Sequence, residues 1–488
     1  MPPRAVFRCD AGPEVGTGHV MRNVAIADRL RDFGWRVAFM TNAETVTSVP
    51  HSLQSFEVRM IAPGGEAETL AATWPGGVDL LVVDSYRLDA AAEGACRPHV
   101  GRLLAVDDLA NRSHAADFLL DATPGRSTGS YEQLVPASTR LLLGPRFAPI
   151  RDPIAHRRRA ALDRRAHPNA LTRLLVTFGG ADTRNGTAIA LEAITRSGLN
   201  TSTDVVLGPA ATNYAAISAS TPSWARVHRD PSDFEDLVIA ADLAIGACGV
   251  SALERCCLGL PTVLVVTADN QREIARGLAA ATGMPVVILD EQEAPRRIAA
   301  ALLSLREPGP RHRASQTAMQ LVDGRGLQRL QLALGEAVSL DAGRVTLRLA
   351  EDSDEAVILA WQQRPGARRH SRNPTPPATE EHKAWFSHLT ADPSRLLCIA
   401  CFDEAPCGFL RLDRRSGIPP EFEVSLLIDE PFRGKGIGRA ILSLARSLAP
   451  GARLVAEILP ENTASLHAFA AAGYTAAGGG LYHEPPPP

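Results

Sequence analysis

The chain is poor in lysine and in long apolar runs. Only two of its 488 residues are lysine, and the formal net charge is −3, so the composition gives no general affinity for nucleic acid. No apolar run approaches the roughly 20 residues with which a helix crosses a bilayer. The first residues lead into a strand rather than into the apolar core of a signal peptide. We therefore expect a cytoplasmic protein without nucleic-acid partners and without membrane insertion.

Cysteine is scarce as well, with eight residues scattered along the chain. The one cluster is Cys398-Ile399-Ala400-Cys401, with Cys407 beyond it. A zinc site requires a second cysteine pair or nearby histidines, and neither is present at a suitable spacing. The pattern therefore favours thiols within strands, no metal, and a reducing compartment.

The chain is rich in alternating strand and helix patterns, and its length suggests about three domains. Residues 1–150 and 151–338 each alternate short apolar runs with helical segments, which is typical of Rossmann-type domains with parallel sheets. The Arg- and Pro-rich segment Pro145–Pro168 is expected to link them. Residues 345–484 predict a smaller α+β domain with a mixed sheet, and Pro485–Pro488 predict a disordered tail.

Two glycine-rich loops each connect a predicted strand to the helix that follows it. The first, Gly16-Thr17-Gly18-His19, follows Ala5-Val6-Phe7, and the second, Arg433–Gly438, follows Val424–Ile428. At such a junction, free backbone N–H groups and the helix dipole face an anion. The two glycine spacings differ, so we expect two different phosphorylated ligands.

His19 lies on the first turn of the helix after the first loop. A histidine at this position can take a proton from water near neutral pH. It can equally hydrogen-bond a phosphate or cap the helix, and the residues alone leave both roles open.

An ordered set of segments resembles the PseG family of hydrolases, which remove UDP from a 2,4-diacetamido-2,4,6-trideoxy-altropyranose during pseudaminic acid synthesis. The resemblance covers residues 4 to about 335 and implies a pair of Rossmann-type domains similar to MurG-like GT-B glycosyltransferases, with UDP held by the second. The segments are Phe7–Gly12, Gly16–Arg22, Val83–Tyr86, Val106–Leu109, Leu143–Arg151, Thr177–Asp182, Gly249–Pro261, Asn270-Gln271 and Val322–Gly326.

The resemblance implies attack by water on the anomeric carbon, with C–O cleavage and inversion. His19 is the candidate base, and Asp10 with Arg8 is expected to position the sugar and the histidine. Asp84 and Asp107 are interpreted as turn formers at strand ends. Helix-terminal amides of the second domain, with the side chains of Asn270 and Gln271, would stabilise the departing UDP. The implied substrate-binding residues are Arg8, Gly16, Gly18, Arg22, Gly179, Gly180, Gly249, Ser251, Glu254, Asn270 and Gln271.

Glu254 has two interpretations. It matches the family carboxylate that binds the ribose hydroxyls, but Ser251-Ala252-Leu253-Glu254 also fits a capping box. Ligand contact is favoured because Gly249-Val250-Ser251 places Glu254 near a helix N-terminus that faces the expected cleft.

The second loop resembles the pyrophosphate loop of GNAT acetyltransferases, which use acetyl-CoA. The strand Glu423–Ile428 is expected to supply a backbone N–H to the oxyanion, with Glu423 as base and Glu421 as its competitor. The family's tyrosine acid is replaced by Phe469, so Tyr474, His467 or solvent would have to act instead. The implied cofactor-binding residues are Ile428, Arg433, Gly434, Lys435, Gly436, Ile437, Gly438 and Asn462.

The two resemblances together predict a bifunctional enzyme. A PseH-like GNAT domain would acetylate N-4 of UDP-4-amino-4,6-dideoxy-N-acetyl-β-L-altrosamine, and the PseG-like part would hydrolyse the product to free sugar and UDP. Trp385 and Arg372-Asn373-Pro374 resemble the acceptor side of such a GNAT domain. The alternative is a GT-B glycosyltransferase with a non-catalytic acetyl-CoA-binding module. A bacillosamine- or legionaminate-type sugar is also compatible, and no oligomeric state follows from the sequence.

Overall fold

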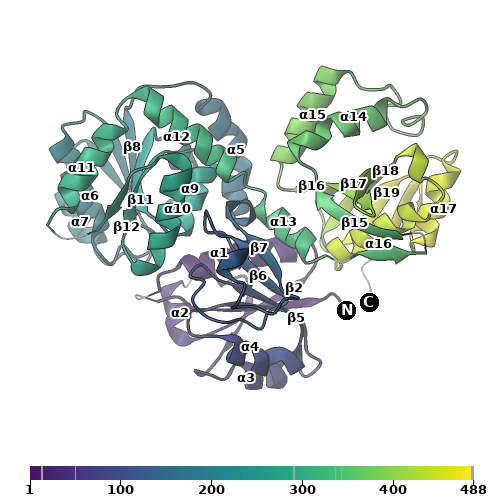
Figure 1. Ribbon diagram of the computed structural model, residues 1–488, viewed down its shortest axis with the longest axis horizontal. Helices are drawn as coiled ribbons and strands as arrows, with labels where there is room; N and C mark the ends of the chain where they lie inside the picture. Colours follow the sequence, from purple (N-terminus) through teal and green to yellow (C-terminus); the bar gives the residue numbers. More distant parts are fainter. Residues whose placement is uncertain (13–14, 50, 290–291, 336, 342, 485–488) are drawn as a thin grey trace. The chain divides into compact units, whose positions relative to one another are not determined.

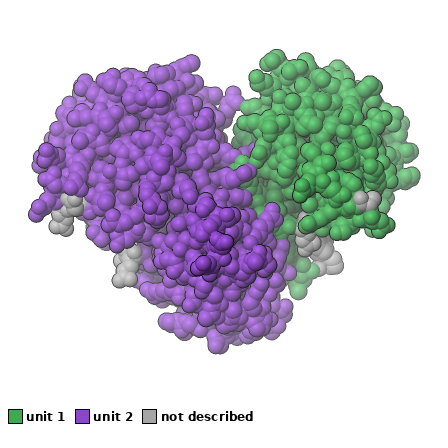
Figure 2. Space-filling model, viewed as in Figure 1, with its two compact units in different colours: residues 1–4, 28–36, 328–488 green, residues 5–27, 37–327 purple. Residues whose placement is uncertain are grey.

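The structure is a computed structural model that describes residues 1–12, 15–49, 51–289, 292–335, 337–341 and 343–484. The chain forms two compact units (Figures 1 and 2). Unit 2 comprises residues 5–27 and 37–327, and unit 1 comprises residues 1–4, 28–36 and 328–488. Among the described residues, no helix is both long and apolar enough to cross a membrane. The predicted tail Pro485–Pro488 lies outside the described residues.

The first lobe of unit 2 is built on a seven-stranded sheet in the order β3-β2-β1-β4-β5-β6-β7. The registers from β1 through β4 and β5 to β7 are parallel. Its elements are β1 (Arg4–Cys9), α1 (Gly18–Asp32), β2 (Arg36–Thr41), α2 (Ala43–Ser48), β3 (Glu57–Met60), α3 (Glu66–Thr73), β4 (Val78–Asp84), α4 (Ala90–Cys96), β5 (Val100–Val106), β6 (Phe118–Asp121) and β7 (Arg140–Leu143).

The second lobe has a six-stranded parallel sheet in the order β10-β9-β8-β11-β12-β13. Strands β11 and β12 are buried along their whole length, as expected for a sheet covered on both faces. The elements are α5 (Asp152–Arg164), β8 (Arg173–Thr177), α6 (Gly186–Ser197), β9 (Ser202–Leu207), α7 (Tyr214–Ser220), β10 (Ala225–Arg229), α8 (Phe234–Ala240), β11 (Leu243–Ala247), α9 (Val250–Cys257), β12 (Thr262–Val266), η4 (Asp269–Gln271), α10 (Arg272–Thr282), β13 (Val286–Ile288), α11 (Ala294–Ser304) and α12 (Pro308–Leu321).

The expected linker Pro145–Pro168 is wrong, because most of it is helix α5. Ile154, Ala155 and Ala161 of this helix are buried in the core of the second lobe. Of the arginines that suggested a linker, Arg157 and Arg159 are exposed, whereas Arg158 and the buried Arg165 donate to backbone carbonyls of the second lobe. A proline in the first turn is compatible with helix initiation. The domain boundaries at residues 150, 338 and 345 stay predictions.

Unit 1 contains a mixed eight-stranded sheet in the order β14-β15-β16-β17-β18-β19-β21-β20. Helices α14 and α15 contribute to the core on one face, and α16 to the core on the other. The elements are α13 (Gly326–Ala333), β14 (Val338–Leu340), β15 (Gly343–Leu349), α14 (Glu355–Gln363), α15 (Thr379–Ala391), β16 (Arg395–Phe402), β17 (Ala405–Arg415), β18 (Glu421–Ile428), α16 (Ile437–Leu448), β19 (Arg453–Glu457), α17 (Thr463–Ala471), β20 (Thr475–Gly478) and β21 (Leu481–Glu484).

The predicted fold class, two Rossmann-type sheets followed by an α+β domain, is confirmed by these three sheets. The clustered thiols Cys398, Cys401 and Cys407 lie in strands β16 and β17 and are buried, as the sequence predicted. Within the described ranges, no group of three potential metal ligands comes together.

A short N-terminal segment, residues 28–36, belongs to unit 1. The ring of Phe33 stacks on Phe422 of β18 with centroids 4.5 Å apart. Gly34 has a φ of +88°, and a Cβ there would lie 2.4 Å from the backbone carbon of Gly451. This close approach of two backbones requires glycine at position 34. Helix α1 therefore contributes its first residues to unit 2 and its last residues to unit 1.

Candidate active sites

Unit 2 holds a cavity of about 880 Å³ that is lined by both of its lobes. A cavity of this size accommodates a nucleotide sugar or a ligand of similar size. Eleven of the residues predicted for the hydrolytic site line it, and the structure therefore brings them together. They are Gly16, Gly18, His19, Arg22, Gly179, Gly180, Gly249, Ser251, Glu254, Asn270 and Gln271.

The imidazole of His19 is held by Asp84 at the end of β4. The distance from His19 Nδ1 to Asp84 Oδ1 is 2.5 Å, and the two side chains are 5% and 0% exposed. The ring also lies edge-on to Tyr86, with centroids 4.6 Å apart. Nε2 of His19 has no hydrogen-bond partner on the described part of the chain. An ionised Asp84 favours the tautomer with hydrogen on Nδ1, which leaves the lone pair on Nε2, a nitrogen that is itself buried.

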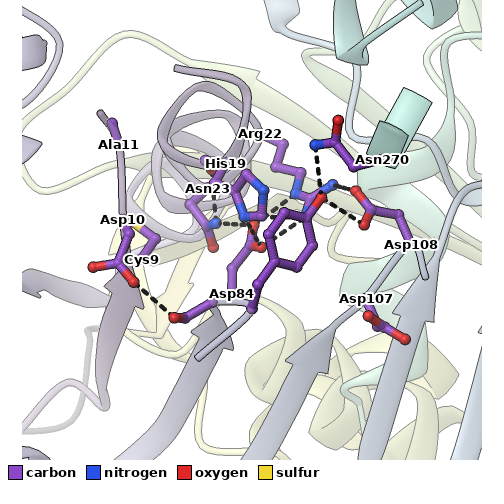
Figure 3. Close-up of polar contacts among 12 residues, drawn as sticks. Cys9, Asp10, Ala11, His19, Arg22, Asn23, Asp84, Asp107, Asp108 and Asn270 are labelled. Carbon is purple, nitrogen blue, oxygen red and sulfur yellow. Dashed lines mark hydrogen bonds and ion pairs between the residues drawn. The ribbon is translucent and has the colours of Figure 1, made fainter. Parts of the chain in front are cut away.

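Asp84 is surrounded by donors from α1, as Figure 3 shows. Arg22 donates from Nε to Oδ2 and from Nη2 to Oδ1, each at 2.6 Å. Asn23 Nδ2 donates to Oδ2 at 2.6 Å. Burial alone would raise the pKa of Asp84, but the charges and hydrogen bonds of Arg22 and His19 hold it well below its ordinary value. Asp84 is therefore ionised near neutral pH.

These contacts correct the interpretation of Asp84, while the substrate contact of Arg22 stays a prediction. Asp84 is not a mere turn former, because its carboxylate holds the imidazole. Arg22 lines the cavity, but its guanidinium is engaged by two carboxylates, Asp84 and Asp108, the latter at 2.8 Å from Nη1. The signal for Asp84 was present in the sequence, since it ends an apolar strand and functional residues cluster at the carboxyl ends of such strands.

Asp10 and Arg8 lie outside the lining of the cavity and contact each other. Arg8 Nη1 donates to Asp10 Oδ1 at 2.6 Å, and Ser85 Oγ donates to Asp10 Oδ2 at 2.7 Å. Neither Asp10 nor Arg8 lines the cavity, and the carboxylate against His19 is that of Asp84. The expectation that Asp10 and Arg8 position the histidine is therefore wrong. Residues i and i+2 at the end of a strand share a face, and these two pair with each other there.

Asp107 fits its interpretation as a turn former in part. Its Oδ2 accepts a hydrogen bond from the backbone N–H of Ala110 at 2.8 Å. It also accepts from Arg112 Nη1 at 2.7 Å and from the buried hydroxyl of Tyr131 at 3.0 Å.

Tyr86 connects the two lobes across the cavity. Its hydroxyl donates to Asp108 Oδ1 at 2.9 Å and accepts from Asn270 Nδ2 of η4 at 3.1 Å. Burial and the charge of Asp108 raise the pKa of Tyr86 well above its ordinary value, so the phenol stays neutral. The ring contact with His19 places this bridge directly beside the imidazole.

Two helix N-termini meet at the cavity. A Cβ on Gly18 at the start of α1 would lie 3.6 Å from a methyl group of Val250 at the start of α9. The cap residue of α9 is Gly249, and no side chain caps its amides. At α6, by contrast, Asp182 already accepts hydrogen bonds from the backbone N–H groups of Gly186 and Thr187. The N-terminus of α9, which no side chain caps, is thus an end available to an anionic ligand.

The capping box interpretation of Glu254 is wrong. Ser251 lies inside α9 rather than at its cap, and the carboxylate of Glu254 is paired with Arg151. Arg151 donates from Nε to Oε1 at 2.6 Å and from Nη2 to Oε2 at 3.1 Å. Both residues line the cavity, so Glu254 lies where a ligand contact requires it.

The second predicted site lies in unit 1, between β18 and α16. The loop residues Gly434 and Gly436 have φ values of +77° and +79°, and Gly436 caps α16 without a side-chain hydrogen bond. Strands β18 and β19 pair in parallel from Glu421–Arg453 to Glu423–Val455, whereas β18 continues to Ile428. The strands therefore diverge beyond Glu423, and backbone groups of β18 face the opening.

The contacts of Glu423 and Tyr474 limit how these residues can act as the base and the acid of this site. Glu423 accepts from Arg372 Nη2 at 2.8 Å and from Arg415 Nη2 at 2.6 Å, which occupies both of its oxygens. Tyr474 is buried against Phe469, with ring centroids 4.8 Å apart, and burial raises its pKa well above the ordinary value. Tyr474 is therefore not placed to act as the acid. Asn462 Oδ1 accepts from Ser465 N at 3.2 Å and caps α17.

Comparison with known proteins places the C-terminal part of the chain in a family. Residues 344–475 match the acetyltransferase (GNAT) domain family. A segment of 138 residues is 36% identical to the putative phosphinothricin acetyltransferase YwnH of Bacillus subtilis, covering 27% of this chain and 83% of that protein. The chain therefore belongs, through this domain, to the GNAT acetyltransferases, whose co-substrate is acetyl-CoA.

Two further relatives are more distant. Over 150 residues the chain is 23% identical to the UDP-2,4-diacetamido-2,4,6-trideoxy-beta-L-altropyranose hydrolase of Campylobacter jejuni, covering 30% of this chain and 52% of that enzyme. Over 486 residues it is 21% identical to the uncharacterized protein MJ1062 of Methanocaldococcus jannaschii, covering 95% of both chains. The chain thus joins a distant relative of the hydrolase to a GNAT domain.

Proposed function

We propose that the chain is a bifunctional enzyme of nucleotide-sugar metabolism. Unit 1 acetylates N-4 of UDP-4-amino-4,6-dideoxy-N-acetyl-β-L-altrosamine, and unit 2 hydrolyses the resulting UDP-2,4-diacetamido-2,4,6-trideoxy-β-L-altropyranose in the cytoplasm. The observation that carries the hydrolysis is the His19 imidazole, fixed by Asp84 at Nδ1 and unpartnered at Nε2 within the described residues. The similarity to the Campylobacter hydrolase supports the choice of sugar.

In the proposed hydrolysis, Nε2 of His19 takes a proton from water as the water oxygen attacks the anomeric carbon. The new C–O bond forms on one face while the bond to the UDP oxygen breaks on the other, so the configuration inverts. The electron pair leaves with UDP, which departs as an anion and needs no proton. The uncapped N-terminus of α9, with that of α1 beside it, is proposed to stabilise its charge.

In the proposed acetylation, the neutral amine attacks the thioester carbonyl of acetyl-CoA, a C–N bond forms and the C–S bond breaks. The amine proton goes through water to Glu423 or to solvent, and CoA leaves as the thiolate, which takes a proton from solvent to become the thiol. Backbone N–H groups of β18 beyond Glu423 are proposed to stabilise the oxyanion. The loop Arg433–Gly438 and Ile428 are proposed to hold the CoA pyrophosphate and pantetheine, with Asn462 nearby.

A second candidate function is favoured by the titratable groups of unit 1. Both oxygens of Glu423 are occupied by arginines, and the hydroxyl of Tyr474 is buried. In this alternative, unit 1 binds acetyl-CoA without turning it over, and unit 2 is a GT-B glycosyltransferase that passes the sugar to an acceptor other than water.

One experiment separates the candidates. The pure chain is incubated with the UDP-4-amino sugar, with and without acetyl-CoA, and the products are followed by NMR. We expect the N-acetyl signal to appear first and UDP with free sugar to follow, both only when acetyl-CoA is present. Unconsumed acetyl-CoA would favour the second candidate. An acetylated nucleotide sugar that persists in water would contradict the proposed hydrolysis.

A further inference from the structure

Arg255 in α9 is the largest fully buried side chain among the described residues, with 1% of its surface exposed. Its Nη2 donates to the carbonyl of Ala247 at 2.8 Å, and its Nε donates to Thr262 Oγ1 at 3.2 Å. Its Nη1 lies 3.3 Å from Ser251 Oγ. All three partners are neutral, so this buried guanidinium pairs with no carboxylate within the described chain.

The neighbouring carboxylate does not supply the missing charge. Glu254 precedes Arg255 in the sequence, but both of its oxygens are paired with Arg151. Burial lowers the pKa of Arg255 from its ordinary value, which reflects the cost of removing an unbalanced cation from water. A chain keeps such a charge at lower cost when a ligand provides the counter-ion.

The guanidinium lies one layer behind the wall of the unit 2 cavity. Its partners Ala247 and Ser251 both line that cavity, and so does the open cap residue of α9, Gly249. A Cβ on Gly246 of β11 would lie 2.6 Å from the carbonyl oxygen of Thr177 and 3.1 Å from Cζ of Arg255, so the glycine leaves room for both. The positive charge and the free amides of α9 therefore act on the same region of the cavity.

We infer that Arg255 is a positioning residue for a diphosphate: it holds the loop from Ala247 to Ser251 and supplies the buried counter-charge for the phosphates that bind there. This inference rests on the proposed function of unit 2, and it adds how that unit selects a nucleoside diphosphate. The charge acts across the loop without touching the ligand. Its contribution therefore grows with the negative charge of the ligand and is absent for a neutral nucleoside.

The competing account is that Arg255 merely shapes the loop. Unit 2 offers a matched control in Arg165, which is 7% exposed and donates to the backbone carbonyls of Val238 and Ala241 at 2.8 and 3.0 Å. Arg165 does not line the cavity. Comparing the two variants therefore distinguishes the general effect of removing a buried arginine from the specific effect of removing Arg255.

The test measures Kd for UDP, UMP and uridine by calorimetry or competition on the full chain, in the wild type and in Arg255→Met, Arg255→Lys and Arg165→Met. We expect Arg255→Met to raise the Kd for UDP by about tenfold or more, the Kd for UMP by less, and the Kd for uridine by about twofold at most. Arg255→Lys keeps the charge without the fork of hydrogen bonds and is expected to retain most of the UDP affinity. Arg165→Met is expected to leave all three unchanged.

An equal loss for all three ligands in Arg255→Met would overturn the inference, and so would an unchanged affinity for UDP. If Arg255→Met does not fold, Arg255→Lys decides alone, because a pure loop-shaping role predicts that lysine fails for every ligand. A wild-type chain that does not bind UDP would instead contradict the proposed function of unit 2 itself.

Discussion

At the scale of single residues, Asp84 holds the imidazole that lines the cavity. Arg22 and Asn23 donate to Asp84, Nδ1 of His19 lies 2.5 Å from it, and its buried charge favours the tautomer with hydrogen on Nδ1. The sequence predicted His19 from its place after a glycine loop. It did not predict Asp84 as its partner, because that contact depends on β4 lying beside β1, and strand order is not encoded in either segment alone.

The first prediction concerns this carboxylate. Asp84→Asn removes the charge that favours hydrogen on Nδ1, so we expect the kcat of UDP release to fall by about 10²- to 10⁴-fold with the fold intact. Release of UDP is followed by ³¹P NMR, and circular dichroism checks the fold. Asp89→Asn is the control, because asparagine caps a helix as well as aspartate does at the start of α4. Equal rates in the wild type and Asp84→Asn would contradict the role of Asp84.

The second prediction concerns a buried histidine away from the cavity. Burial would lower the pKa of His114, but the carboxylates of Asp107 and Glu93 raise it to about 9, with Nδ1 2.8 Å from Glu93 Oε1. In the unfolded chain this pKa is about 6.5. The folded state therefore gains stability from protonated His114 that is complete below pH 6.5 and is lost as the pH rises through 9.

We expect the unfolding midpoint of unit 2 in urea to fall between pH 6 and pH 9, and the fall to be smaller in His114→Gln. Exposed His156 provides the control, since His156→Gln is expected to follow the wild-type curve. A His114→Gln variant with the full wild-type pH dependence would show that another group titrates in this range.

Among the elements, the buried parallel strands were predictable because each is a short apolar run that ends in a polar residue. Helix α5 was not, because arginine is its most frequent residue and only three small or apolar residues mark its buried face. The role of the helix N-termini was likewise predictable only in part from the sequence. Sequence alone predicted an anion site at α9, but not that Asp182 fills the equivalent end of α6.

The third prediction tests the loop before α16. Gly436 adopts a left-handed φ of +79°, and the nearest atoms to a Cβ there are 3.8 Å away, so Gly436→Ala costs about 1 kcal/mol of backbone strain rather than a clash. We expect the KM for acetyl-CoA to rise several-fold, because the strained loop presents its amides less well. UDP release from the acetylated sugar is expected to stay unchanged.

The matched control for Gly436→Ala is Gly198→Ala. Gly198 caps α6 in unit 2 with a φ of +64° and has no atom within 4 Å of an added Cβ. It carries the same kind of strain far along the chain from the loop, so the KM for acetyl-CoA is expected to keep its wild-type value. A rise in both variants would show that the effect is general destabilisation.

For the whole molecule, the succession of two Rossmann-type sheets and an α+β sheet followed from the patterns along the chain. The assignment of residues 28–36 to unit 1 did not. That segment looks like an ordinary helix end and turn, and only the fold reveals that Phe33 stacks on Phe422 and that Gly34 meets Gly451. Long-range packing of this kind leaves no local signal.

The fourth prediction follows from this packing. Phe33 is 2% exposed within the core of unit 1, so Phe33→Ala is expected to lower the free energy of unfolding of that unit by about 3–5 kcal/mol. The measurement is the temperature at which acetyl transfer is lost after brief heating. Exposed Arg31→Ala in the same segment is the control, and equal heat resistance of Phe33→Ala and the wild type would show that the segment does not support unit 1.

The most direct test of the account is UDP release in ¹⁸O-labelled water by the wild type and by His19→Ala, read by ³¹P NMR. If water activated by His19 attacks the anomeric carbon, the wild type releases UDP whose β-phosphate carries no label, and His19→Ala releases UDP at least about 10²-fold more slowly while still acetylating the amino sugar. Label on the β-phosphate, or undiminished release by His19→Ala, would contradict the account.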